Sequence, residues 1–346
     1  MMREQRFSWV SYVLLVSAVA ALGCAPMEDM LFARVIRSNF EAAPPAIDGM
    51  RVIVCGSASP LGNDPDRAQA CIAVITEEHF FLFDVGARSP LRLAQARVPI
   101  GRLDGVFLTH FHSDHIAAIP DVNLQSWVFG RRESLPVYGG AGVEEVVSGF
   151  NTAYRLDQRY RTEHHGSELL PAVAGPMTAQ VFKPGDVVFQ DDLMTVTSFP
   201  VEHPPIHPAV GYRVDYGGRS VVISGDTNAS ETLFAEAEGA DLVLHDALAR
   251  HMLDVMIEAT TELDVQPMPQ IMTDVVDYHA DSLSLEAAAA DAGVSQLVLY
   301  HLVPAPPAGI GERIFRRGLS DETILARDLH TFDLPANSAE IRIQEP

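Results

Sequence analysis

The sequence predicts a layered α/β protein. Short segments rich in β-branched and aromatic residues alternate with segments of helical period from about residue 50 to residue 305. A hydrophobic content of 47% with 20% charged residues is that of an ordinary globular domain, and 346 residues suffice for one large domain or two small ones. Several predicted strands are followed at once by His or Asp, which indicates that one edge of the sheets carries a polar site.

Each element is predicted from its own pattern. Runs of apolar, β-favouring residues bounded by turn residues predict strands at 50–54, 71–76, 80–83, 106–109, 135–138, 187–189, 193–201, 210–213, 220–223, 241–244 and 297–300. A period near 3.6 predicts helices at 90–96, 117–127, 143–154 and 283–292. Gly293 is placed to close the last of these helices. Residues 155–176 are less regular, and His164 and His165 within them are predicted to be surface residues.

The densest cluster of candidate ligands directly follows the predicted strand at 106–109. Imidazoles two residues apart in an extended segment point the same way, so His110 and His112 can bind one metal ion. Asp114 and His115 lie on the next turn and can reach a second ion. Nitrogen donors with a carboxylate suit zinc and its neighbours. A chance surface cluster is the alternative, and the spacing after a buried strand disfavours it.

Later segments supply further candidates. Asp226 follows a predicted strand on a glycine turn, where one carboxylate can bridge two ions. His301 ends the predicted strand at 297–300. His203 and His207 lie in one proline-rich loop, and either can add a ligand. Because ligands gather where strands end, a single site is expected.

The stretch from His110 to His115 resembles the HxHxDH signature of the metallo-β-lactamase fold hydrolases. The resemblance covers about residues 50 to 305. It is closest to the ribonuclease Z and arylsulfatase-like branch, through Ser-Gly-Asp-Thr at 224–227, a His before an alanine-rich helix and a His after the last strand. It implies a four-layer αββα sandwich and a binuclear metal-dependent hydrolase.

The same resemblance implies a complete ligand set. One ion would be held by His110, His112 and His203, the other by Asp114, His115 and His301, with Asp226 between them. Two zinc ions are expected, with manganese or iron as alternatives. Asp84 matches a family Asp that lies beneath the site and orients a ligand, and a turn or helix N-cap is its alternative role.

The resemblance assigns proton transfer to three residues. Asp114 would hold the nucleophile, and His279 would protonate the leaving oxygen as general acid, unless it is only a surface His near a helix start. Asp246 stands where ribonuclease Z members carry Glu, so it is shorter by about 1.5 Å and its expected direct assistance is weak. The His245-Asp246 pair would instead orient the next His.

These implications favour an enzyme in which metal-activated hydroxide attacks a phosphodiester or sulfate ester of a small molecule. A transfer-RNA 3′-processing endonuclease is one alternative, and a non-catalytic exported metal-binding protein is another. The net charge of −22 repels polyanions, and residues 155–176 lack the long Gly/Pro-rich basic arm of the ribonuclease Z branch, so nucleic acid is a disfavoured partner. A homodimer and a monomer both remain open.

The N-terminus predicts export. Two arginines precede an apolar run from about residue 7 to 22, which is typical of a secretory signal peptide over residues 1–24. Ala-Leu-Gly-Cys at 21–24 resembles a bacterial lipobox, so acylation of Cys24 would anchor a periplasmic or outer-membrane lipoprotein. A cleaved soluble export signal and an uncleaved anchor are the alternatives. Residues 25–48 are expected to be a tether, and residues 49–346 the hydrolase domain.

The two remaining cysteines flank the first predicted turn of the fold. Cys55 ends the first strand and Cys71 begins the second. An exported protein can oxidise such a pair, and two buried free thiols are the alternative.

Overall fold

The computed structural model describes residues 27–37, 48–61 and 64–346. The chain divides into two units, Met1–Pro45 and Ala46–Pro346. In the first unit, residues 27–37 form an exposed helix inside the segment expected to be a tether. The predicted signal peptide and Cys24 lie outside the described residues. No helix among the described residues is both long and apolar enough to cross a membrane.

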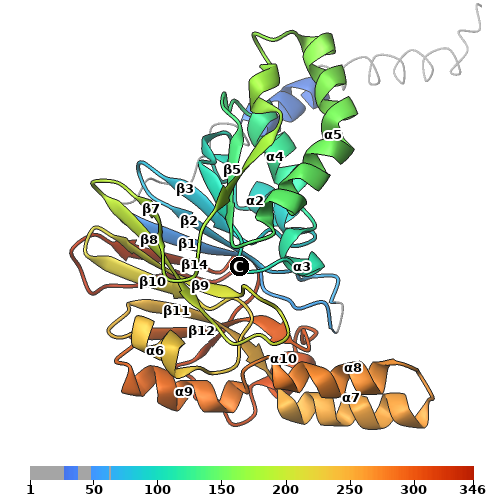
Figure 1. Cartoon of the computed structure of the whole chain (residues 1–346), viewed down its shortest axis with the longest axis vertical. Helices are drawn as coiled ribbons and strands as arrows, with labels where there is room; N and C mark the ends of the chain where they lie inside the picture. Colours follow the sequence, from blue (N-terminus) through green and yellow to red (C-terminus); the bar gives the residue numbers. More distant parts are fainter. Residues whose placement is uncertain (1–26, 38–47, 62–63) are drawn as a thin grey trace, which may run out of the picture. The chain divides into compact units, whose positions relative to one another are not determined.

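The unit Ala46–Pro346 contains two sheets (Figure 1). The first has eight strands in the order β15-β14-β1-β2-β3-β4-β5-β6 and the second has seven in the order β13-β12-β11-β10-β9-β8-β7. The strands of the first sheet are β1 Gly49–Gly56, β2 Cys71–Ile75, β3 Phe80–Phe83, β4 Gly105–Phe107, β5 Leu135–Gly139, β6 Met177–Val181, β14 Thr331–Pro335 and β15 Arg342–Gln344. Those of the second are β7 Val187–Gln190, β8 Met194–Pro200, β9 Val210–Tyr216, β10 Arg219–Ile223, β11 Leu242–Leu248, β12 Gln296–Val303 and β13 Ile324–Leu325.

Helices lie on the outer face of each sheet. The first sheet is covered by α2 Ser89–Gln95, α4 Ile119–Val128 and α5 Val143–His165. The second is covered by α6 Glu231–Glu236, α9 Ser282–Asp291 and α10 Ile310–Phe315. The remaining helical segments are α3 Ser113–Ile116, α7 Arg250–Glu262, α8 Met268–Asp274, and the 3₁₀ turns Ile100–Arg102, Ala172–Ala174 and Val275–Asp277. The four-layer αββα order that the resemblance implied is therefore confirmed.

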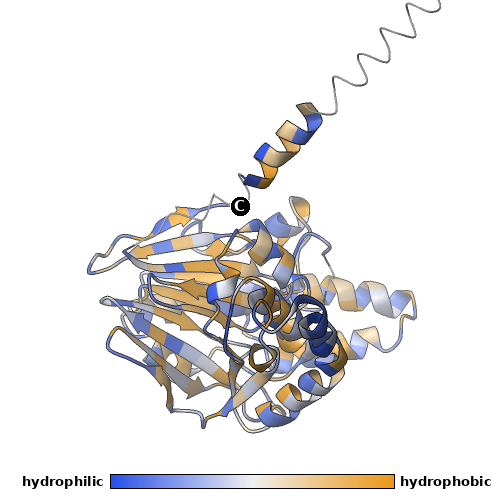
Figure 2. Cartoon of the chain, turned by 90° about the horizontal axis from the view of Figure 1, so that it is seen from above, coloured by the Kyte–Doolittle hydropathy of each residue, from blue (hydrophilic) through white to orange (hydrophobic). Residues whose placement is uncertain are grey.

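Strand periodicity explains how the layers hold together. In β1, Val52 and Val54 point into the core between the two sheets, while Ile53 and Cys55 point to the helices outside. Both faces of the central strands are buried, so these strands are apolar almost throughout. Figure 2 shows apolar residues concentrated in the strands. The sheet interior is thus a rigid base on which loops at the strand ends can position polar groups.

Most predicted elements are confirmed, but the predicted set was incomplete, since α6, α10 and the strands β13 to β15 were not predicted. Helix α5 runs to His165, past the predicted end at residue 154, because ion pairs four residues apart, such as Arg161 with Asp157, support its polar last turns. Strand β6 and the helical hairpin α7–α8 were not predicted either. His164 and His165 are exposed, as predicted.

The open question about the cysteines is settled by the structure. Cys55 and Cys71 form a disulfide with Cα atoms 4.9 Å apart. The bond joins neighbouring strands β1 and β2 of the first sheet.

Candidate metal centre

The site is built where strands of the two sheets end. Strand β4 leads into His110 and His112, and helix α3 begins directly after His112. Asp114 and His115 lie on α3 and are buried. The extended backbone at His112 and the helical turn after it place the two pairs in different directions. One six-residue stretch therefore reaches two neighbouring positions.

The structure brings all seven predicted ligands together in two clusters, in which every member except the partly buried His112 is buried. The first contains His110, His112, His203 and Asp226, and the second contains Asp114, His115, Asp226 and His301, with candidate ligand atoms within 4.8 Å of one another in each. Asp226 belongs to both, as expected of a bridging carboxylate. His207, the competitor of His203, is exposed and in neither cluster.

Short distances within the clusters show how tightly the donors converge. His112 Nδ1 lies 2.9 Å from His110 Nε2 and 3.3 Å from His203 Nε2. His301 Nε2 lies 3.0 Å from Asp114 Oδ2, and its Nδ1 lies 3.4 Å from Asp226 Oδ1. Such spacing of imidazoles and carboxylates is what a shared cation would require.

The donor set fits a metal ion. Buried polar atoms normally have hydrogen-bond partners, because leaving them unpaired is costly. Four buried atoms of the clusters have none among the described residues, namely His115 Nε2, His203 Nδ1, Asp226 Oδ1 and His301 Nδ1. Nitrogen and oxygen donors without sulfur suit zinc, manganese or iron(II).

Glycine is needed directly before Asp226. Gly225 has φ +63°, and a Cβ there would lie 2.8 Å from both Thr109 Cβ and the Val210 carbonyl oxygen. The backbone therefore turns sharply after β10 and passes close to the β4 end. This explains why the Ser-Gly-Asp-Thr run positions Asp226 against the histidines of the other sheet.

His301 is not at the end of its strand, contrary to the sequence prediction. Strand β12 continues to Val303, and the register with β11 shifts so that Tyr300 pairs with Asp246 but Leu302 pairs with Ala247. His301 is the extra residue of this bulge, with φ +42°. The bulge turns the His301 side chain into the site. The regular alternation of side chains along a strand does not reveal such a bulge.

Asp84 has the orienting role that the resemblance suggested, and it is not a helix cap. Its Oδ2 lies 2.8 Å from His115 Nδ1, and it accepts hydrogen bonds from the backbone N–H and hydroxyl of Thr109. Holding Nδ1 in this way leaves Nε2 of His115 to face Asp226. Asp84 itself has φ +55°, an uncommon conformation for a non-glycine residue.

Electrostatics separate the histidines into two kinds. Burial lowers the pKa of His110 well below its usual value, lowers that of His112, and lowers that of His203 to about 4. Burial also opposes protonation of His115 and His301, but Asp226 and its neighbours outweigh it and raise both pKa values. The first cluster therefore offers neutral imidazoles, the form that binds metals.

Asp246 and His279 form a buried pair beside the clusters. His279 Nδ1 lies 2.8 Å from Asp246 Oδ2, and His245 Nδ1 lies 3.1 Å from Asp246 Oδ1. The carboxylate of Asp246 therefore contacts His279, although its side chain is shorter than that of Glu. His279 is only 7% exposed and its ring stacks on His301 with centroids 5.4 Å apart, so it is not a surface residue.

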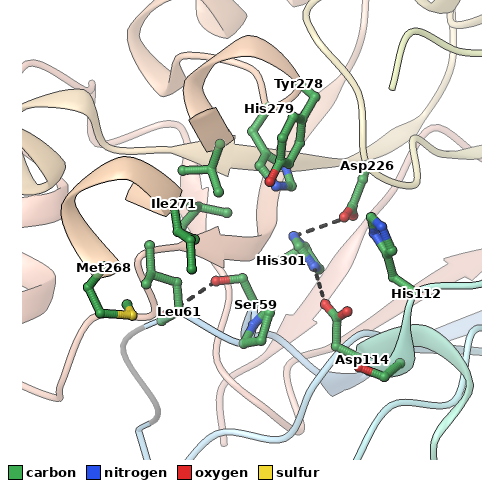
Figure 3. A pocket seen from close by; sticks show the side chains of 14 residues that line it. Ser59, Leu61, His112, Asp114, Asp226, Met268, Ile271, Tyr278, His279 and His301 are labelled. Atoms are coloured by element: carbon green, nitrogen blue, oxygen red, sulfur yellow. Dashed lines mark hydrogen bonds and ion pairs between the residues drawn. The ribbon is translucent and has the colours of Figure 1, made fainter. Parts of the chain in front are cut away.

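A cavity of about 380 Å³ opens in front of the clusters (Figure 3). Metal-cluster residues and His279 line one side, and apolar residues of helix α8 line the other. Sequence reasoning missed this apolar side. The only sequence signal for it was the spacing of Met268, Ile271 and Val275, which lie three and four residues apart, as on one face of a helix.

Comparison with known proteins agrees with this geometry. Residues 81–302 match the family model described as a beta-lactamase superfamily domain. The protein named ribonuclease Z from Mycobacterium bovis (strain BCG / Pasteur 1173P2) is 32% identical over 291 residues, 82% of this chain and 98% of the relative.

Two crystal structures show the same fold. That of the metallo-beta-lactamase fold protein YhfI from Bacillus subtilis has a TM-score of 0.58 at 21% identity, covering 83% of this chain and 100% of that one. That of Zn²⁺-bound PqqB from Methylobacterium extorquens has a TM-score of 0.57 at 17% identity, covering 82% of this chain and all of the other.

Proposed function

This chain belongs to the metallo-β-lactamase superfamily, and we propose that it is a hydrolase that cleaves phosphodiester bonds at a binuclear metal site. The observation that carries this proposal is the convergence of seven His and Asp side chains, six of them buried and His112 partly buried, on two adjoining positions. The relative named ribonuclease Z supports phosphodiesters over other esters. Sulfate esters are the second ester class that this site would suit.

The proposed ligands follow the two clusters. His110, His112 and His203 would hold one ion, Asp114, His115 and His301 the other, and Asp226 would contact both. We propose zinc, in keeping with the zinc-bound PqqB structure and with the nitrogen-rich donor set. When bound, such ions supply Lewis acidity and lower the pKa of a water to near neutrality.

The remaining chemistry falls to side chains of this chain. His279 uses Nδ1 to contact Asp246, so Nε2 is the nitrogen left to donate a proton to the leaving oxygen. Asp246 would hold His279 in that tautomer and orientation. Asp114 would position the attacking group from its place on α3, where it lines the cavity.

Cleavage of precursor transfer RNA is the second candidate, favoured by the identity to ribonuclease Z. Two features of this chain count against it. The part of the cavity lining that the structure describes contains no Lys or Arg to meet a phosphate backbone. The arginines of α5 are partly neutralised by carboxylates, such as Glu163 beside Arg159.

We further propose that the protein is exported and anchored through acylated Cys24. The Cys55–Cys71 disulfide supports an oxidising compartment, since cytosolic proteins rarely keep such bonds. Cys24→Ala should release the protein from the membrane fraction, and retention of that variant on membranes would contradict the lipid anchor.

A substrate panel tests the activity. Purified mature protein loaded with zinc or manganese is assayed on a p-nitrophenyl phosphodiester, phenyl sulfate, a lactone and precursor transfer RNA. We expect turnover of the phosphodiester. Activity on none of the four with two metals bound would instead favour a non-catalytic metal-binding protein.

A further inference from the structure

The cavity in front of the metal clusters has two chemically different walls. The polar wall is formed by His112, Asp114, Asp226, His279 and His301. The apolar wall is formed by Leu61, Met268, Ile271, Val275 and Val303. Figure 3 shows Leu61, Met268 and Ile271 on one side and the metal-cluster residues on the other. The volume of about 380 Å³ lies in the range of small-molecule sites.

The apolar wall is a fixed part of the fold. Val275 and Val303 are buried in one hydrophobic cluster with Leu248, Leu253 and Met272. That cluster attaches the hairpin α7–α8 to the end of the second sheet, and Leu61 and Met268 pack against it. Ile271 is 43% exposed at the mouth of the cavity. Ile271 and the other apolar side chains of the lining together form one apolar surface beside the polar site, and such a surface is a feature that a ligand would cover.

Charge restricts what can fill this space. Among the residues that the structure describes, the lining contains two carboxylates and no Lys or Arg. A second anionic group on a substrate would therefore find no cationic partner and would face Asp114 and Asp226. Tyr278 adds an aromatic ring to the lining, held 4.9 Å from the ring of His203. An uncharged apolar or aromatic group is the ligand that these surfaces suit.

The position of His279 indicates which part of the substrate occupies the apolar side of the cavity. Under the proposed function, His279 gives its proton to the leaving oxygen. Tyr278 packs against the hydrophobic cluster that contains Val275 and Val303, and His279 follows it directly in the chain, so His279 lines the cavity where the polar wall meets the apolar one. The group bonded to the leaving oxygen therefore lies against Ile271 and its neighbours, rather than the group that stays on phosphorus.

We infer that the substrate is a phosphodiester whose leaving alcohol is uncharged and apolar, of the alkyl or alkyl-aryl class. The assignment rests on the proposed function. Water adds its oxygen to phosphorus, the bond from phosphorus to the alcohol oxygen breaks, and the proton from His279 passes to that oxygen. The products are a phosphomonoester and the free alcohol, and the proton lost by water restores His279.

A binding measurement tests the wall without any turnover. The free alcohols phenol, 4-ethylphenol and 4-butylphenol are titrated by calorimetry into the protein, both metal-free and zinc-loaded. Affinity should rise about two- to fourfold per methylene, because each buried methylene contributes roughly this factor. The heat-capacity change should be negative and grow with chain length. Affinities that are flat with chain length would overturn the inference.

A kinetic series tests whether the leaving group of the substrate lies against the apolar wall. Methyl phenyl phosphate, methyl 4-ethylphenyl phosphate and methyl 4-butylphenyl phosphate keep the leaving-group chemistry nearly constant while the apolar length grows. In the zinc-loaded enzyme, kcat/KM should rise about two- to fourfold per methylene. A flat series in an active enzyme, or a preference for a 4-sulfophenyl leaving group, would overturn the inference and leave the proposed function standing.

Variants of the apolar wall test whether it causes the dependence of kcat/KM on chain length. Ile271→Asn should lower the total rise in kcat/KM across the series by about two- to fourfold, since the polar side chain no longer covers apolar surface, and Ile271→Val should keep most of the rise. Val255→Asn is the matched control, because Val255 is 65% exposed on α7 and does not line the cavity. A full chain-length dependence in Ile271→Asn would overturn the wall assignment. Absence of turnover on every ester with two metals bound would overturn the proposed function itself, even if the phenols bind.

Discussion

At the scale of single residues, Asp226 is the group on which the site depends most. It is the one carboxylate shared by both clusters, and it lies within 3.3 Å of His115 Nε2. Removing it would leave both positions one donor short. Its neighbours would remain buried without their shared acceptor.

We therefore expect Asp226→Ala to lose metal and turnover together. The fall in activity should exceed the roughly 100-fold that is typical of residues supporting a ligand from behind. Elemental analysis of the folded variant and its rate on a phosphodiester are the two measurements. Asp121→Ala, an exposed carboxylate on α4, is the control and should change neither. Full turnover of Asp226→Ala with two metals retained would contradict the bridging role.

The acid role of His279 predicts a dependence on the leaving group. A leaving group as stable as p-nitrophenolate needs little protonation, whereas phenolate needs more. His279→Ala should therefore lower kcat on methyl phenyl phosphate by about 100-fold or more, and on methyl p-nitrophenyl phosphate much less.

Asp246→Asn should show the same pattern more weakly, because it acts through His279. Metal content should stay at two in both variants. Equal losses on the two substrates would mean that these residues only support the local structure.

At the scale of elements, the first sheet is fastened by a covalent link between β1 and β2. The cysteines are separated by 16 residues in sequence, and the segment between them includes Ser59 and Leu61 of the cavity lining. The link therefore restrains a loop that contributes to the site as well as two core strands.

The double variant Cys55→Ala/Cys71→Ala should lower the free energy of unfolding by about 3 kcal/mol, the value expected for closing a loop of this length. Urea unfolding with and without a thiol reductant measures this. The reductant should destabilise the natural sequence and leave the double variant unchanged. An equal response of both proteins to reductant would show that the bond adds no stability.

At the scale of the whole molecule, a buried charge network joins the two ends of the domain. Glu312 on α10 pairs with Arg67, at 2.7 Å between Nη2 and Oε1, and with Arg327. Asp328 binds Arg92 and the backbone N–H of Ser57. The network connects the loop after β1 to segments about 250 residues later, so its loss is expected to affect global stability.

The network predicts a pH-dependent stability. Burial raises the pKa of Glu312, but Arg327 and Arg67 outweigh it and leave that pKa below its usual 4.5. The carboxylate therefore stabilises the fold above about pH 4.5, and this contribution is lost as the pH falls through the lower folded-state pKa.

Glu312→Gln should cost about 3 kcal/mol at pH 7, since it leaves the buried Arg67 without its ionised partner. The difference from the natural sequence should shrink below pH 4.5, as measured by urea midpoints at several pH values. A difference that is constant with pH would rule out this electrostatic role.

Much of the fold and most of the candidate ligands could be predicted from the sequence, because their signals are local. A buried strand followed by His110, His112, Asp114 and His115 needs no distant residue to be noticed. The end of α5 was missed because its last turns are held by charge pairs rather than an apolar stripe. The hairpin α7–α8 was missed because its apolar face serves a cavity and a satellite cluster instead of the main core.

The sequence by itself determined that the fold is a layered α/β one and which side chains are chemically able to bind metal, since both follow from local periodicity and residue type. Only the tertiary structure decided which atoms meet. The bulge that turns His301 into the site, the reach of Asp246 to His279 and the apolar wall opposite the metal clusters each join segments that are distant in sequence. Such contacts depend on how two sheets and a helical hairpin pack, which no stretch of residues encodes alone.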